Sequence, residues 1–239
     1  MIGRLAVVAI AGTIGAVVLL ATGIGLSGRD RVDAMHLWGA MRSSCEPTAS
    51  TRQQVTLPFT ATDNLVIDLP ASVRYQPGDR AEAVVSGDPA FLDHVRIDGG
   101  RLSLDCDPGW FASRLDISLS GPAISNWKLL GSGDLTLSQI NQPQLRVSIK
   151  GSGSVAATGA ADTVGLDISG SGAARLRDLT AKSVQIVIRG SGDAQMTAQA
   201  DADVSISGSG NVELFGHPVV RRSEIRGSGR IVQTPDPAR

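Results

Sequence analysis

The tripeptide Gly-Ser-Gly occurs six times between Gly131 and Gly229, at nearly constant spacing. Successive first glycines are separated by 20, 19, 20, 18 and 19 residues. A fixed period of about 20 residues is typical of repeat proteins, in which each repeat is one unit that buries its apolar face only by stacking on its neighbours. This period therefore constrains the fold more than any other feature of the chain.

Apolar residues alternate with polar ones on both sides of the tripeptide. Around Gly170 and Gly172, for example, the apolar residues Leu166, Ile168 and Ala174 share the parity of the glycines, and the serine has the other parity. Strand side chains point alternately to opposite faces, so the pattern predicts two strands joined by a tight bend, with glycines inward and serines outward. The predicted structural corners are Gly131, Gly133, Gly151, Gly153, Gly170, Gly172, Gly190, Gly192, Gly208, Gly210, Gly227 and Gly229.

Short strands repeating every 19 residues or so predict an all-β fold, a parallel β-solenoid with one GSG corner per coil. The competing arrangement is an antiparallel sandwich with turns every 8–12 residues. Identical corners at a fixed period favour the solenoid, because stacked coils require the same bend at the same place in every coil.

The chain divides into four segments on composition. Residues 1–28 contain an uncharged run from Leu5 to Leu26 after Arg4, which predicts either a cleaved signal peptide or a membrane anchor. Residues 29–52 form a polar linker, and 53–234 form the β-solenoid domain, with an irregular N-terminal β part at 53–121 and the GSG repeats at 122–234. Residues 235–239 are a tail. The protein is expected to be exported, to the periplasm or cell surface, and anchored in the inner membrane if the first segment stays uncleaved.

The chain has two cysteines, Cys45 and Cys106. They are compatible with one disulfide in an oxidising compartment and equally with two free thiols. Because there is no CxxC pair or His/Cys cluster, the sequence predicts no metal site and no cofactor.

These features together resemble the GIN-domain family, described as auto-transporter adhesin head domains. The resemblance covers roughly residues 55–233 and includes NLVIDLPASVRYQPGD, VRIDGGRLSLDC and the GSGD signature, which stands at Gly131–Asp134 and Gly190–Asp193. It implies a right-handed β-helical fold in a bacterial envelope protein, and it implies no reaction.

The GSG motif does not match known catalytic loops. A phosphate-binding loop needs a following lysine and a helix, and a nucleophile elbow needs the pattern GxSxG. A serine triad would also need a histidine, and the three histidines are His36 in the linker, His94, and His217 in a turn. Six interchangeable serines indicate a structural row rather than six nucleophiles.

A polysaccharide-acting enzyme is the main catalytic alternative, and it would require two carboxylates at a defined separation. The candidates are Asp134, Asp167, Asp193 and Glu213. Asp134 and Asp193 hold the same place after GSG but lie three coils apart, with Ser154 and Ala173 in between. No close pair emerges, so the sequence predicts a non-enzyme.

The outward residue before each corner is alternately basic and small. Lys150, Arg189 and Arg226 stand there, and they either keep the surface soluble or form a binding strip for an anionic envelope polymer. The formal net charge of -1 gives no electrostatic case for nucleic acid.

The sequence therefore predicts a non-catalytic, exported envelope module with an adhesion, scaffold or ligand-binding role. Its expected partners are the membrane, through an uncleaved N-terminal segment, and an envelope glycan or protein. A polysaccharide-acting enzyme and a self-assembling envelope structural protein are the alternatives.

Overall fold

The structure, a computed structural model, describes residue 45 and the ranges 53–60, 62–107 and 115–235. The predicted signal or anchor segment at 1–28 lies outside these residues, as does most of the predicted linker at 29–52 and of the tail at 235–239. Within the described ranges, no helix is long and apolar enough to cross a membrane.

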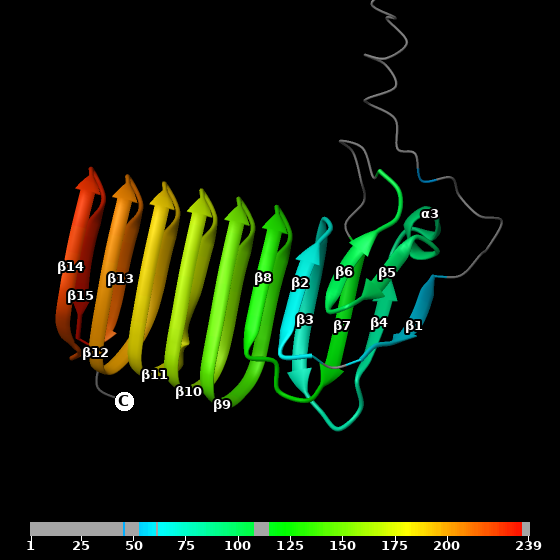
Figure 1. Cartoon of the computed structure of the whole chain (residues 1–239), viewed down its shortest axis with the longest axis horizontal. Helices are drawn as coiled ribbons and strands as arrows, with labels where there is room; N and C mark the ends of the chain where they lie inside the picture. Colours follow the sequence, from blue (N-terminus) through cyan, green and yellow to red (C-terminus); the bar gives the residue numbers. More distant parts are fainter. Residues whose placement is uncertain (1–44, 46–52, 61, 108–114, 236–239) are drawn as a thin grey trace, which may run out of the picture. The chain divides into compact units, whose positions relative to one another are not determined.

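The GSG repeats form coils that stack side by side (Figure 1). Each coil has two halves, and we call the strands that lead into the GSG corners the pre-corner layer and those that leave them the post-corner layer. Four long strands each leave one corner along the post-corner layer, bend, and return along the pre-corner layer to the next corner: β9 (Asp134–Gly151), β10 (Ser154–Gly170), β11 (Ala173–Gly190) and β12 (Asp193–Gly208).

Shorter strands complete the stack at both ends of the repeats. β8 (Asn126–Gly131) leads into the first corner, and β13 (Asn211–Gly216), β14 (Val219–Gly227) and β15 (Arg230–Thr234) end the stack. All neighbouring strands of the repeats pair in parallel, and the first glycine of each corner pairs with the first glycine of the next. The predicted parallel β-solenoid is confirmed, and the antiparallel sandwich is excluded for the repeats.

The N-terminal part is less regular. β2 (Asn64–Asp68) and β3 (Ala71–Pro77) form one coil whose corner is Leu69-Pro70 instead of GSG. Its neighbours on one side are β6 (Arg101–Leu104) and β7 (Leu115–Gly121), and those on the other are β8 and β9. The coil formed first in the chain is therefore not the first in the stack.

Antiparallel strands end this side of the solenoid. β4 (Glu82–Ser86) pairs antiparallel with β7 and with β1 (Gln54–Pro58), and β5 (Val95–Asp98) forms a hairpin with β6. One short helix, α3 (Pro89–Leu92), precedes β5 and is capped by the Asp88 carboxylate, which accepts from the Ala90 amide. We call β1, β4, β5, β6, β7 and α3 the cap.

The core between the two layers is aliphatic throughout the middle coils. In the pre-corner layer each coil buries an isoleucine two residues before the first glycine: Ile149, Ile168, Ile188 and Ile206. The Ile149 Cγ2 methyl lies where a Cβ on Gly172 of the next coil would sit, at 2.6 Å, and the later coils repeat this contact. The second glycine therefore leaves room for an isoleucine of the preceding coil.

The first glycine of each corner differs from the parity prediction, which placed it inward. Gly151, Gly170, Gly190 and Gly208 are half-buried, with φ between 123° and 134°. A Cβ on any of them would overlap the carbonyl oxygen of the first glycine in the preceding coil. Strand parity fails here because the chain leaves the extended conformation, so this glycine points along the stack and not into the core.

Candidate functional site

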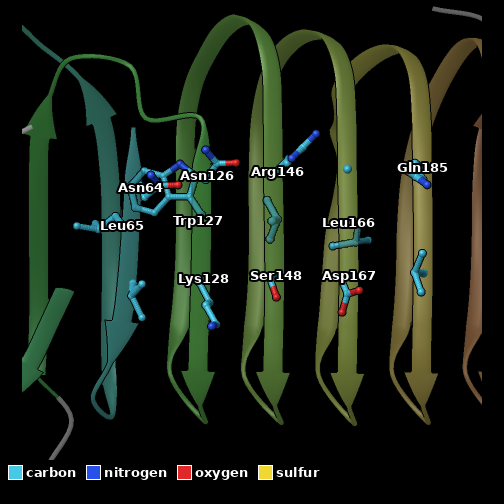
Figure 2. Close-up of a pocket in the computed structure, with 14 residues that line it drawn as sticks. Asn64, Leu65, Asn126, Trp127, Lys128, Arg146, Ser148, Leu166, Asp167 and Gln185 are labelled. Atoms are coloured by element: carbon cyan, nitrogen blue, oxygen red, sulfur yellow. The ribbon is translucent and has the colours of Figure 1, made fainter. Parts of the chain in front are cut away.

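A groove runs across the outer surface of the pre-corner layer, perpendicular to its strands (Figure 2). It has a volume of about 470 Å³, which lies within the range of small-ligand sites. Five strands contribute, from β2 through β8, β9, β10 and β11. Because these strands pair in one continuous parallel register, the groove has a rigid floor.

The outward positions of the strands define two rows along the groove. The row three residues before the first glycine contains Lys128, Ser148, Asp167 and Val187, and pairing continues it to Val66 on β2. Figure 2 shows Lys128, Ser148 and Asp167 on three adjacent strands. The row combines one cation, one hydroxyl, one carboxylate and two apolar side chains.

The second row, five residues before the first glycine, consists of Asn64, Asn126, Arg146, Gly165 and Gln185. Gly165 is the one position here with no side chain, so the groove stays open beside Arg146. An added Cβ at Gly165 would lie 3.4 Å from the Arg146 Cγ. The row therefore has a gap between Arg146 and Gln185, and two further amide side chains, Asn126 and Asn64, lie beyond Arg146.

The charges in the groove are divided unevenly. Asp167 pairs with Arg189, at 2.7 Å between Oδ2 and Nη1, and accepts a hydrogen bond from the Ser169 hydroxyl. Lys128 and Arg146 pair with no carboxylate among the described residues, and Arg146 contacts the neutral amide of Gln144. The groove therefore has an unpaired cationic side toward β8 and β9, and a neutralised acidic side toward β10 and β11.

The corner serines lie exposed in a row outside the groove. Their backbone amides bind the preceding coil: the Ser171 amide donates to the Gly151 carbonyl at 3.0 Å, and the Ser191 amide to Gly170 at 2.9 Å. His217 follows β13 at the edge opposite the corners, and His94 lies in the cap with Nδ1 2.6 Å from the Asp105 carboxylate. His36 lies outside the described residues. Neither described histidine is placed to activate a corner serine.

The four candidate carboxylates do not gather in one place. Asp167 is in the pre-corner layer, whereas Asp134, Asp193 and Glu213 are in the post-corner layer. Asp134 Oδ1 accepts from the Ser154 hydroxyl at 2.5 Å, and Ser154 and Ala173 separate it from Asp193 as the sequence indicates.

Asp193 and Glu213 form the nearest approach to a carboxylate pair, because they lie on adjacent coils of the post-corner layer and two residues apart in register. Asp193 accepts from the backbone and side-chain nitrogens of Asn211, and Glu213 accepts from Gln195 and Thr234. Both are bonded in a shallow, open hollow that does not exclude water.

Cys45 and Cys106 are joined in a disulfide that ties residue 45 to the end of β6. His94, Asp105 and Cys106 offer ligand atoms within 4.8 Å of one another. A cysteine binds metal as a thiolate, so the disulfide removes Cys106 as a ligand. Asp105 is already engaged by His94 and by Arg96, at 2.6 Å from Oδ2 to Nη2, so this cluster serves as a polar contact between the start of the β5 segment, just after α3, and the end of β6.

The predicted binding strip lies in one outward row, as its register requires: Lys150, Arg189 and Arg226 occupy β9, β11 and β14. Arg189 pairs with Asp167, and Arg226 pairs with Glu224 at 2.6 Å. Lys150 pairs with no carboxylate among the described residues. Of the three cations in the strip, Arg189 and Arg226 are therefore neutralised by carboxylates, and Lys150, which lies beside the groove, has no such partner among the described residues.

Sequence reasoning missed most of the groove. The residues that line it were visible as outward positions, but the sequence pointed to a binding surface only in the row next to the corner, and to the row of Asp167 only as a place for paired carboxylates. Counting back three and five residues from each first glycine aligns Lys128 with Ser148 and Asn126 with Arg146, as the structure pairs them. That alignment was the available signal.

The corners, the stacked coils and the two-layer core define a class of protein, the parallel β-solenoid with a GSG bend. The chain belongs to the family described as "Putative auto-transporter adhesin, head GIN domain", which matches residues 63–218. The predicted family is therefore confirmed. The description names an adhesin and no reaction. No curated protein matches the chain.

Solved structures of similar fold include proteins from Bacteroides and Parabacteroides species. A putative adhesin from Bacteroides fragilis has 17% identity and a TM-score of 0.60, and the match covers 79% of this chain and 99% of that one. A putative lipid binding protein from Parabacteroides distasonis has 18% identity, a TM-score of 0.48, and coverage of 76% and 96%. A putative adhesin from Parabacteroides merdae has 15% identity, a TM-score of 0.47, and coverage of 76% and 95%. At these identities, the first of these likenesses establishes the fold.

Proposed function

We propose that this chain is a non-catalytic, exported binding module of the bacterial cell envelope, and that it holds a glycan in the groove of its pre-corner layer. The groove is the observation that carries the proposal. It combines about 470 Å³ of open volume with amide, hydroxyl and charged side chains on a rigid parallel floor. Side chains held on strands position ligand contacts more accurately than loops do.

The chemistry of the groove suits a sugar. Asn64, Asn126 and Gln185 each offer an amide donor and acceptor, which is what a ring bearing many hydroxyl groups requires. The gap at Gly165 leaves room for a ring to lie against the sheet. The adhesin description of the family supports a binding role over a catalytic one.

The predicted export supports the same role. The uncharged run from Leu5 to Leu26 is long enough for a signal peptide or an anchor, and the Cys45–Cys106 disulfide suits an oxidising compartment. An anchored or secreted chain would present the groove to envelope polymers.

A self-assembling structural role is the second candidate, favoured by the end of the stack at β14 and β15. The exposed large hydrophobic side chains of the described residues all lie there: Val219, Ile225 and Val232 are 66%, 42% and 46% exposed. Unpaired strand edges with apolar side chains are templates for pairing with another chain. Light scattering tests this role: size that rises with concentration, and falls for Val232→Lys, supports it, and a strict monomer contradicts it.

Glycan-array binding by the full-length chain tests the groove. Gly165→Leu adds an outward side chain in the middle of the groove, and Ala156→Leu adds one on the same strand but in the opposite layer. We expect Gly165→Leu to lose binding and Ala156→Leu to keep it. If both variants bind like the parent, the ligand does not occupy the groove; if the parent binds no glycan, the proposed function is wrong.

A further inference from the structure

Three cations surround one hydroxyl at the edge of the groove. Arg146 and Lys150 flank Ser148 along β9 at the two nearest outward positions, and Lys128 pairs with Ser148 on the neighbouring strand β8. Adjacent strands lie about 4.8 Å apart, and outward neighbours along a strand lie about 7 Å apart. We call Lys128, Arg146 and Lys150 the cation triad.

The triad lacks counter-charges within the described part of the chain. No ion pair involves any of its three members, and the carboxylates closest to it in register have partners elsewhere. Asp68 on β2 binds Arg101, and Asp167 on β10 binds Arg189. Lys128 lies diagonally across from Arg146 and Lys150, well within the distance over which exposed charges interact, so a bound anion would reduce the repulsion among the three cations.

We propose that the cation triad is the acid-recognising subsite of the groove, and that the ligand is a glycan whose sugars carry carboxylate groups. This inference rests on the proposed function and specifies its ligand. A carboxylate placed over Ser148 would accept from the hydroxyl and from the charged nitrogens of Arg146 and Lys128. Hydrogen bonds between charged groups are the stronger ones, so this subsite would dominate the affinity.

The strand on the other side of Ser148 sets an upper limit on ligand charge. Asp167 pairs in register with Ser148 on the side opposite Lys128, and its carboxylate repels a second negative charge there. Beyond it, Gly165, Gln185 and Val187 are uncharged. A sugar acid with one charge per unit fits this arrangement better than a phosphate polymer with dianionic or closely spaced groups.

The triad includes only one of the three cations of the predicted binding strip. Lys150 belongs to it, whereas Arg189 and Arg226 already neutralise Asp167 and Glu224. Lys128 and Arg146, which the strip did not include, take their place. The recognition surface is therefore a cluster on β8 and β9 and not a stripe along the whole stack.

The test compares each glycan with its own uncharged form. We would measure binding of the full-length chain to an array of uronic-acid oligosaccharides, each with its carboxylates free or methyl-esterified, and to phosphorylated oligosaccharides. We expect the free acids to bind at least about tenfold more tightly than the esters, with the preference falling as salt rises.

Variants separate the triad from general surface charge. Replacing two triad members in Lys128→Gln/Arg146→Gln should reduce free-acid affinity by about tenfold or more and leave ester affinity nearly unchanged. Arg226→Gln, which removes one cation outside the groove, is the matched control and should bind like the parent.

The outcomes distinguish the two proposals. Equal binding of acids and esters, or stronger binding of phosphorylated sugars, would overturn the carboxylate assignment and leave the glycan-binding function standing. A loss of preference in Arg226→Gln as large as in the double variant would show that long-range charge, not the triad, is responsible. Binding to no member of the array would overturn the proposed function itself.

Discussion

The GSG coils and the N-terminal part have different structural roles and bury different types of side chain. The middle coils repeat one corner, and between Leu135 and Ile206 their buried residues are aliphatic, with Met196 the exception. The N-terminal part must end the stack, and it buries Tyr75 and Phe91, with Trp127 of the adjoining strand β8 packed against Tyr75. Stacking identical coils needs small, uniform side chains, whereas closing an irregular end needs large ones that fill unequal spaces.

The two regions also satisfy their backbones differently. From the second corner on, the backbone amide of the corner serine donates to the first-glycine carbonyl in the corner of the preceding coil. Every coil therefore presents backbone groups at its edge to which a further coil can bind. The cap turns β1 and β4 antiparallel and adds α3, the β5–β6 hairpin and a disulfide. The repeated corners therefore allow further coils to be added to the stack. The antiparallel strands and the helix of the cap end the stack at the other side, and covering an edge in this way is how natural sheets avoid open edges.

The largest effect is expected at a first glycine of the repeats. Gly190→Val puts a Cβ onto the Gly170 carbonyl, at a φ of 127° that side chains disfavour. Strain and overpacking together should lower the free energy of unfolding by about 3–5 kcal/mol, measured by urea denaturation. Ser191→Ala, one residue away and exposed, should cost less than about 0.5 kcal/mol. Similar midpoints for the two variants would show that the corner does not depend on its glycine.

The second effect tests the cap. Removing the disulfide in Cys45→Ala/Cys106→Ala opens a link across a sequence separation of 61 residues, and should cost about 2–4 kcal/mol. In hydrogen exchange, we expect β5, β6 and α3 to lose protection while β10 and β11 keep theirs, because repeat stacks unfold locally. Uniform loss of protection along the whole chain would mean that cap and coils unfold as one unit.

The same contrast explains what could be predicted from the sequence. The repeats could be predicted because period and parity are local signals, repeated until chance is excluded. The DGGRL hairpin was also predictable, since Gly99 and Gly100 supply the positive φ of its turn. The position of the β2–β3 coil, whose strand β3 lies between β7 and β9, could not be predicted. The alternation of apolar and polar residues shows which side of a strand is buried but not which strand lies beside it.

In the candidate site, too, residues at repeated positions could be predicted from the sequence, and residues brought in by strand pairing outside the repeats could not. Lys150 was identified because it holds a fixed place in the repeat, whereas Asn64 and Asn126 reach the groove through the pairing of β2 with β8, across a segment with no repeat. The direction of the first glycines was missed for a local reason. Their positive φ breaks the two-residue alternation on which the prediction depended.

A smaller effect is expected at Tyr75, where coil and cap meet. Its ring packs at 4.8 Å from that of Trp127, and its hydroxyl lies 2.8 Å from the Pro122 carbonyl and 3.1 Å from that of Gly121. Tyr75→Phe keeps the ring but leaves these carbonyls without the donor, at a cost of about 1–2 kcal/mol in the free energy of unfolding. Tyr75→Leu, which loses the ring as well, should cost more; equal costs would mean that the hydroxyl alone matters.

The smallest effect concerns acid. The pKa of Asp105 is lowered, chiefly by its hydrogen bond to His94; desolvation opposes this shift, and the charge of Arg96 adds a smaller lowering effect. Because the pKa in the folded state lies below that in the unfolded state, the stabilisation is complete above the ordinary aspartate pKa of about 4 and is lost as pH falls through the lowered value. The pair is exposed, so the effect should be small and confined to the cap.

Thermal unfolding between pH 7 and pH 3 measures this effect. Asp105→Asn should lower the melting temperature at pH 7, and the difference from the parent should shrink as pH falls below about 4 and the parent carboxylate takes up its proton. Asp98→Asn, on the β5 strand and without a described ion pair, is the matched control and should follow the parent at every pH. If Asp105→Asn differs from the parent by the same amount at both ends of the range, its carboxylate does not stabilise the cap through its charge. The contact between the segment that follows α3 and the end of β6 would then depend on packing, as the contacts between the GSG coils do.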